Sequence, residues 1–251
     1  MLLFVVPLQS RSASNDWDMV SRLCIRTLRS ICRQCEGDFR VVLVCNEPPE
    51  GLPAHPALEV ISEGFVAPAP GPTTAERMAD KWLKVKRGLI AVRECAPAYV
   101  MVVDADDCVH RDLSRWASPD LSPNGWLLDT GFIWNRGSRW LLKQRDFDRY
   151  CGTSSILYCR ETDLPQSMDE DREKFPILRF GHSTIARAFA ERGTPLLPLP
   201  FPGAVYNTAT GENDSRVDLR TWSSRRLKVE RLLRYRPLTS RYREAFGLYD
   251  L

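Results

Sequence analysis

Uninterrupted runs of apolar residues mark three segments in the first half of the chain. These runs are Leu2–Val6, Val41–Cys45 and Tyr99–Val103, and none of them contains a charged residue. A continuous apolar run of this length is typical of a strand that is covered on both faces, as in the middle of a parallel sheet. The shorter segment Leu58–Ser62 is a further strand candidate.

Two segments between these strands have the spacing of amphipathic helices. The first helix is expected after a cap at Ser14 or Asn15, and its apolar positions are Trp17, Val20, Cys24, Leu28, Ile31 and Cys35. The second helix begins with a capping box formed by Thr73 and Glu76. Its apolar positions are Met78, Trp82, Val85, Leu89 and Val92, and its lysines fall on other faces. Strand–helix–strand–strand–helix–strand is the order of a nucleotide-binding half of an α/β sheet.

The second half of the chain has a different pattern. Short strands are expected at 126–128, 132–134, 139–142 and 152–159, and a helix is expected from His182 to Arg192 before Gly193. The segment 163–174 is polar and acidic and is predicted to be a loop. The segment 220–243 is strongly basic. We therefore expect a nucleotide-binding half at residues 1–115, a second half at 116–215 and a basic helical appendage at 216–251.

Composition narrows the class of protein without naming a function. The chain has 251 residues, a formal net charge of +3 and eight cysteines, and no apolar run approaches the ~18 residues that a membrane-spanning helix needs. The charge gives no indication of nucleic-acid binding. Reduced thiols and the absence of a signal-peptide pattern at the start predict a cytoplasmic protein. The basic C-terminal segment could be a solvated helix or a peripheral contact with the anionic inner membrane.

Three carboxylates follow the strand at 99–103 directly: Asp104, Asp106 and Asp107. They are expected at the carboxyl edge of the sheet, where open α/β folds bind their ligands. Two aspartates separated by one residue can direct oxygens to one hard divalent cation, which a nucleoside diphosphate also coordinates. We therefore expect Mn²⁺ or Mg²⁺ at this position, with Asp106 as the direct ligand and Asp104 on the ribose or on a metal-bound water.

Together these segments resemble the GT-A glycosyltransferases, especially the family-2-like bacterial enzymes that build surface polysaccharides. The likeness extends over residues 2–210. Five segments carry the likeness: residues 4–8, residues 28–34, Asp80-Lys81-x-x-Lys84, Asp104-Ala105-Asp106-Asp107 and Gly152-Thr153-Ser154. The resemblance implies a mostly parallel central sheet flanked by helices. It also implies a metal-dependent transfer, with inversion, of a sugar from a nucleotide-diphospho-sugar donor to a glycan or lipid-linked acceptor.

Several polar residues are candidates for donor binding. In the related enzymes the loop after the first strand holds the nucleobase. In this chain, Lys81 and Lys84 could reach the diphosphate from the helix beside the donor cleft. The donor-site candidates are Pro7, Gln9, Ser10, Arg11, Asn46, Lys81, Lys84 and Asp104. Of the two lysines, Lys84 is slightly favoured.

The catalytic base is left open between His182 and Asp171. Related enzymes have a Glu-Asp pair at a helix start, where this chain has Gly181-His182-Ser183, and the nearest acidic cluster is Asp169-Glu170-Asp171. A helix N-terminus disfavours the protonated form of His182, which keeps the imidazole usable as a base or as a metal ligand completing the site of Asp104 and Asp106. Asp171 is the alternative base.

Other functions remain as alternatives. A non-catalytic GT-A-like scaffold subunit would not need Asp106. A sugar nucleotidyltransferase would share the strand order, but the loop at 8–13 contains no glycine. A calcium loop is disfavoured because Cys108 and Val109 occupy positions where a ligand and a glycine are required. A haloacid dehalogenase-type phosphatase is disfavoured because its aspartate motif normally follows the first strand and has Thr or Val where this chain has Cys108.

Overall fold

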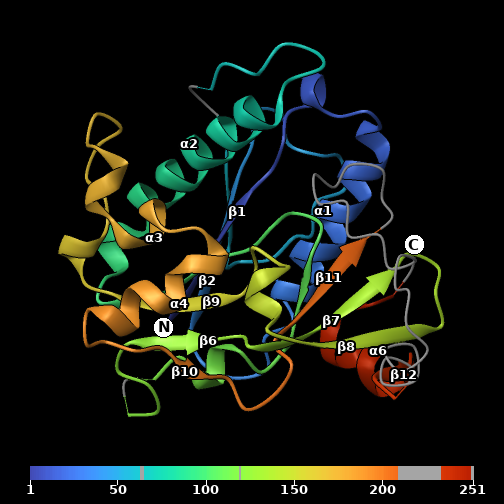
Figure 1. Cartoon of the computed structure of the whole chain (residues 1–251). Helices are drawn as coiled ribbons and strands as arrows, with labels where there is room; N and C mark the ends of the chain where they lie inside the picture. Colours follow the sequence, from blue (N-terminus) through green and yellow to red (C-terminus); the bar gives the residue numbers. More distant parts are fainter. Residues whose placement is uncertain (63–64, 119, 209–232, 250–251) are drawn as a thin grey trace.

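The structure is a computed structural model that describes residues 1–62, 65–118, 120–208 and 233–249. Helices flank two β-sheets, and the sheets lie side by side (Figure 1). The larger sheet has seven strands in the order β10-β6-β9-β4-β1-β2-β3. Their bounds are β1 Leu2–Pro7, β2 Phe39–Val44, β3 Leu58–Ile61, β4 Ala98–Val102, β6 Gly125–Leu127, β9 Ser155–Cys159 and β10 Leu197–Pro198.

The first four strands of this sheet are parallel, as the apolar runs predicted. Strand β1 lies between β2 and β4 and pairs with both in parallel, while β2 pairs in parallel with β3. Strand β9 runs antiparallel to β4 and β6. The sheet is therefore mixed but mostly parallel, and the α/β class expected from the sequence is confirmed at that level.

Two long helices cover opposite faces of β1. Helix α1 (Trp17–Ile31) packs on the side of Phe4, whereas α2 (Thr74–Val92) packs on the side of Val5. The capping box of Thr73 is confirmed. The predicted caps of α1 were wrong, because Asp16 accepts the backbone N–H of Met19 instead.

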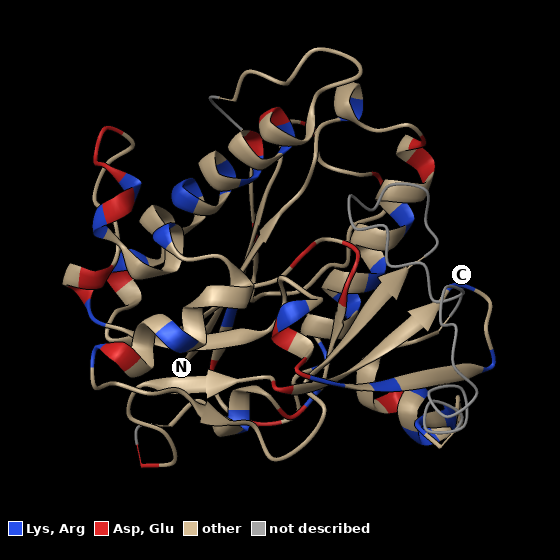
Figure 2. Ribbon diagram, in the orientation of Figure 1, with Lys and Arg blue, Asp and Glu red and all other residues tan. Residues whose placement is uncertain are grey.

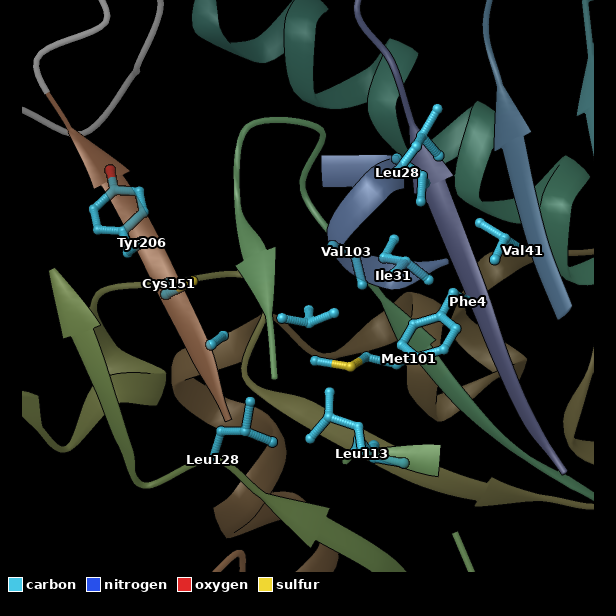
Figure 3. Close-up of a cluster of buried hydrophobic side chains, with 14 of the residues drawn as sticks. Phe4, Leu28, Ile31, Val41, Met101, Val103, Leu113, Leu128, Cys151 and Tyr206 are labelled. Carbon is cyan, nitrogen blue, oxygen red and sulfur yellow. The ribbon is translucent and has the colours of Figure 1, made fainter. Parts of the chain in front are cut away.

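The first core cluster lies between α1 and the larger sheet and continues to the second sheet. Phe4, Leu28, Ile31 and Met101 meet there at one end, and Tyr206 of the second sheet lies at the other (Figure 3). Cys35 was expected on the buried face of α1, but it is exposed beyond the end of the helix. Its backbone N–H donates to the carbonyl of Arg111, so the chain has already turned away from the helix.

A second sheet, which the sequence did not predict, has five strands in the order β12-β8-β7-β11-β5. Their bounds are β5 Cys108–Val109, β7 Thr130–Asn135, β8 Trp140–Arg145, β11 Ala204–Thr208 and β12 Tyr235–Pro237. Because β5 follows β4 closely, the loop at 103–107 passes from one sheet to the other. The aspartate motif therefore lies where the two sheets meet.

The described end of the chain belongs to this second sheet. Strand β12 pairs with β8, and Phe246 of helix α6 (Ser240–Phe246) is buried against Phe132. We expected a separate helical appendage, and residues 233–249 instead add a strand and a packed helix. Residues 216–232 of the predicted appendage lie outside the described residues.

Two further helices, α3 (Pro176–Arg179) and α4 (His182–Glu191), pack near the edge of the larger sheet. Of α4, the sequence predicted both the start and, within one residue, the end. The acidic segment 163–174 before them was expected to be a loop, but it ends in the short 3₁₀ helix Arg172–Lys174, and another, Glu161–Asp163, leads into it. None of the described helices is long and apolar enough to cross a membrane.

Candidate active site

A cleft of about 300 Å³ opens at the carboxyl ends of β1 and β4. Seven segments contribute to it: the exit of β1, helices α1 and α2, the loop after β4, the segment before β9, the start of α4 and strand β11. Its polar lining residues are Gln9, Arg77, Asp80, Lys81, Lys84, Asp104, Asp106, Tyr150, His182 and Tyr206. The structure thus gathers in one cleft most of the residues that the sequence singled out.

Three hydrogen bonds between side chains and backbone groups hold the aspartate loop, one from Thr153 and two from α1. The backbone N–H of Asp104 donates to the Thr153 hydroxyl at 2.9 Å. On the opposite side, Thr27 donates to the carbonyl of Ala105 at 3.0 Å and Arg26 to the carbonyl of Asp106 at 3.2 Å. These contacts fix the direction of both cleft-lining carboxylates before any ligand binds.

The Asp104 side chain is confined on both of its oxygens. Its Oδ1 lies 2.5 Å from Nζ of Lys81, which comes from α2. Its Oδ2 lies against Gly152, where a Cβ atom would come within 2.5 Å of it. A glycine at position 152 leaves room for the carboxylate in this orientation, which explains why a glycine stands next to Thr153.

The surroundings of Asp106 disfavour its ionised form. Burial and, secondly, the negative charge of Asp104 raise its pKa from 3.8 to about 6, although Lys81 and Arg26 act in the opposite direction. Desolvation by itself would lower the pKa of Lys81, but the attraction of Asp104, Asp106 and Asp107 outweighs it and raises the pKa. The aspartates at 104–107 therefore carry more negative charge than Lys81 neutralises.

The donor set of this loop fits a hard divalent cation. Two carboxylates one residue apart, with the pKa of Asp106 raised by crowding, supply the oxygen ligands and the uncompensated charge that Mg²⁺ or Mn²⁺ requires. Among the described residues, however, no group of three or more His, Cys, Asp or Glu side chains is placed to hold a metal. His182 lines the same cleft as both aspartates, and its role as a further metal ligand stays a prediction.

The two candidate lysines differ sharply in their surroundings. Lys81 points at Asp104, whereas Lys84 is buried and its Nζ lies 2.6 Å from Oδ2 of Asp80. Burial lowers the pKa of Lys84, and Asp80 offsets part of that effect. The slight preference for Lys84 as the diphosphate contact stays a prediction, although its ammonium is buried and already paired with Asp80.

His182 is the first residue of α4, and it lines the cleft. Its Nδ1 makes a short contact with the carbonyl oxygen of Asp148. A carbonyl can only accept, so Nδ1 carries the proton and Nε2 keeps its lone pair. The ring is therefore held in the tautomer that can accept a proton at Nε2.

Four other candidates do not line the cleft. Ser10 bonds Ser12, Arg11 lies over the ring of Trp17, and the amide of Asn46 donates to the carbonyl of Phe65. Asp171 is exposed and caps a 3₁₀ helix by accepting the backbone N–H of Glu173 at 3.0 Å. Its assignment as the base loses support, because it is tied to a surface turn.

Sequence reasoning missed residues that position the aspartate loop. Asp107 is fully buried and accepts the thiol of Cys151 at 3.1 Å and the backbone N–H of Asn207 at 3.3 Å. Burial, then the charges of Asp106 and Asp104, raises its pKa well above the ordinary value. Neither Cys151 nor Asn207 stands in a motif, so only their contacts reveal this role.

Comparisons with known proteins leave the family open. No protein-family description matches the sequence, and no curated protein matches it. One structural neighbour is a protein of Bacillus anthracis assigned as a glucose-1-phosphate thymidylyltransferase, solved with sucrose. The two share 9% identity at a TM-score of 0.39, over 81% of this chain and 88% of the neighbour. A likeness this remote does not support an assignment of family or activity.

Proposed function

We propose that this protein is a divalent-metal-dependent glycosyltransferase that uses a nucleotide-diphospho-sugar donor. The observation that carries the proposal is the cleft itself, where Asp104 and Asp106 after β4, Lys81 of α2 and His182 of α4 lie around one cavity. Carboxylates that hold a cation, a lysine beside them and a base across the cavity are the groups that glycosyl transfer requires. The proposed acceptor is a hydroxyl of a glycan or lipid-linked glycan in bacterial surface polysaccharide synthesis.

The donor would bind along the carboxyl ends of β1 and β4. Gln9 and Pro7, at the exit of β1, are placed to contact the nucleoside. When bound, a divalent cation supplies Lewis-acid stabilisation of the diphosphate leaving group. Lys81 adds a positive charge next to Asp104. Its ammonium can turn from Asp104 to a phosphate oxygen once the charge of the carboxylate is otherwise neutralised.

The acceptor hydroxyl would be deprotonated by His182. Its Nε2 takes the proton while the acceptor oxygen forms a bond to the anomeric carbon and the bond from that carbon to the diphosphate oxygen breaks. The electron pair of the broken bond leaves with the nucleoside diphosphate. The contact of Nδ1 with the Asp148 carbonyl orients the ring for this role and stabilises the protonated imidazole.

The test begins with ligand binding. Nucleoside diphosphates, each with and without manganese, are screened for an increase in melting temperature, because a ligand that binds the folded state stabilises it. We expect one nucleotide to stabilise the wild type with manganese and chelator to cancel most of the gain. The matching nucleotide sugars are then used in transfer assays with glycan acceptors.

Two variants sharpen the test. Asp106→Asn should abolish transfer and metal-dependent stabilisation while the fold is retained. Asp112→Asn is the matched control, because it removes a partly exposed carboxylate six positions on that does not line the cleft. Full activity of Asp106→Asn would refute the metal site. Release of pyrophosphate from a nucleoside triphosphate and a sugar phosphate would identify a nucleotidyltransferase instead, and binding of no nucleotide would favour the scaffold.

A further inference from the structure

A second cavity, of about 700 Å³, lies along the outer side of α1, away from the cleft of Asp106. Three arginines of α1, Arg22, Arg26 and Arg29, line it together with Arg33, which lies just beyond the end of the helix. The spacing of four and three residues places the three helical arginines along one face of α1 over about 10 Å. In Figure 2 the basic residues recur along this helix as successive blue bands. We call this cavity the arginine groove.

No acidic residue lines the arginine groove in the part of the chain that the structure describes. The rest of the wall consists of Ile25, Cys32, Pro53, Ala54, His55, Gly247 and Tyr249. Within the described residues, none of the four arginines has a carboxylate within the 4.0 Å of an ion pair. Like charges gathered in a concave site create a positive potential that attracts anions.

Arg26 is the residue that distinguishes this groove from an ordinary basic surface. It is only 4% exposed, and its Nε and Nη1 have no hydrogen-bond partner among the described residues. Its Nη2 donates to the carbonyl of Asp106, and its guanidinium lies 5.3 Å from the centre of the Trp134 ring. A buried guanidinium with unpaired N–H groups is costly unless an anion compensates it.

Two further side chains suit a ligand that carries phosphate. The Nδ1 of His55 accepts the backbone N–H of Ala57 at 3.1 Å, so in the neutral ring Nε2 carries the proton and is a donor. Tyr249 is 41% exposed and lies under the guanidinium of Arg33 at 5.0 Å. Arginine matches phosphate oxygens in charge and in fork geometry, and an aromatic ring can support a base or a sugar.

We propose that the arginine groove binds a second phosphate-bearing ligand, separate from the donor cleft. Its volume falls in the range of small-molecule sites of nucleotide size. The phosphate could belong to a free nucleotide or to the head group of an anionic or phosphate-linked lipid, and both would meet the same arginines. The inference does not depend on the proposed glycosyltransferase activity, because the groove and the cleft share no lining residue.

The test uses the full-length protein with inorganic pyrophosphate in chelator, so that metal-dependent binding in the cleft is suppressed. Isothermal titration should detect binding that weakens with added salt. The double variant Arg22→Gln/Arg29→Gln, at two exposed positions, should weaken it by about tenfold or more. Arg187→Gln is the control, because it removes an exposed arginine on the surface of α4 instead.

A second arm separates the two sources of phosphate. The same proteins are sedimented with phosphatidylcholine vesicles that do or do not contain phosphatidylglycerol. Binding of pyrophosphate without binding of vesicles supports a soluble ligand, whereas arginine-dependent binding of the anionic vesicles supports a lipid head group. If neither probe binds, or if the double variant binds as well as the control, the proposal is overturned. Transfer activity is not a readout here, so failure of the proposed function leaves these outcomes unchanged.

Discussion

At the scale of single residues, charge crowding is the main feature of the cleft. Burial disfavours ionisation of Asp106, and the nearby charge of Asp104 adds to this effect. Such an arrangement stores destabilising energy that a bound cation can release. Asp106 is therefore expected to cost stability in the absence of ligand and to contribute to function in its presence.

This view predicts a pH-dependent stability difference for Asp106→Asn. In the folded protein Asp106 holds its proton up to about pH 6, whereas the ordinary pKa is 3.8. The folded state therefore binds more protons between these values, and its stability falls as pH rises through that window. The variant lacks this loss, so in chelator it should match the wild type below pH 4 and exceed it at pH 8, by at most about 3 kcal/mol.

Urea unfolding at several pH values measures this difference. The upper limit will not be reached, because part of the Asp106 side chain faces solvent. Manganese should reduce the difference by stabilising the wild type alone. A variant that is no more stable than the wild type at pH 8 in chelator would show that Asp106 is not under electrostatic strain.

A second prediction at this scale concerns Gly152. The added methyl of Gly152→Ala would come within 2.5 Å of Oδ2 of Asp104, so the carboxylate must move away from Lys81 or the backbone must shift. Overpacking of this kind costs about 1–3 kcal/mol. We expect weaker manganese-dependent nucleotide binding by titration calorimetry, with the fold retained. Unchanged affinity would mean that the position of Asp104 is not critical.

At the scale of elements, the start of α4 is a better position for a catalytic base than the acidic segment before it. Helix α4 begins at the cleft and presents His182 to it, while Asp171 caps a separate 3₁₀ turn at the surface. Position and tautomer both favour His182 as the base.

The kinetic prediction follows from this difference. His182→Ala should lower kcat by about 10²- to 10⁴-fold with little change in donor KM, because a base acts only in the transition state. Asp171→Asn, an equally small change at the rival position, should behave as the wild type. Steady-state kinetics on both variants decide the matter, and the reverse pattern would return the role to Asp171.

At the scale of the whole molecule, the two sheets are joined beneath the cleft. Asp107 follows β4 of the larger sheet and accepts hydrogen bonds from Cys151 and from Asn207 of β11 in the second sheet. The cleft is thus built on a junction of two sheets, and its geometry depends on their staying together.

Replacing Asp107 should therefore weaken the whole fold. Asp107→Ala removes the carboxylate that accepts hydrogen bonds from the buried Cys151 thiol and from the Asn207 N–H, which should cost about 1–3 kcal/mol. Asp107→Asn keeps an acceptor oxygen and should lose less. Urea unfolding should show one cooperative transition shifted to lower concentration. A stable Asp107→Ala protein would indicate that this junction is not a structural support.

Some of this protein was determined by local sequence. The strands β1, β2 and β4, the capping box of α2 and the start of α4 follow from apolar runs and capping residues within a few positions of each other. The place of Asp104 and Asp106 at a strand end follows in the same way. Local hydrogen bonding and side-chain periodicity need no knowledge of distant residues.

Other features were decided only by the tertiary structure. Thr153 holds the backbone of Asp104 across 49 positions, and Asn207 reaches Asp107 across 100. The second sheet, the pairing of Lys81 with Asp104 and the arginine groove depend on contacts of this kind. Sequence periodicity shows which face of an element is apolar, but it does not show which partner that face will meet. Packing between distant segments determines that partner, and with it which charges are paired, buried or free to bind a ligand.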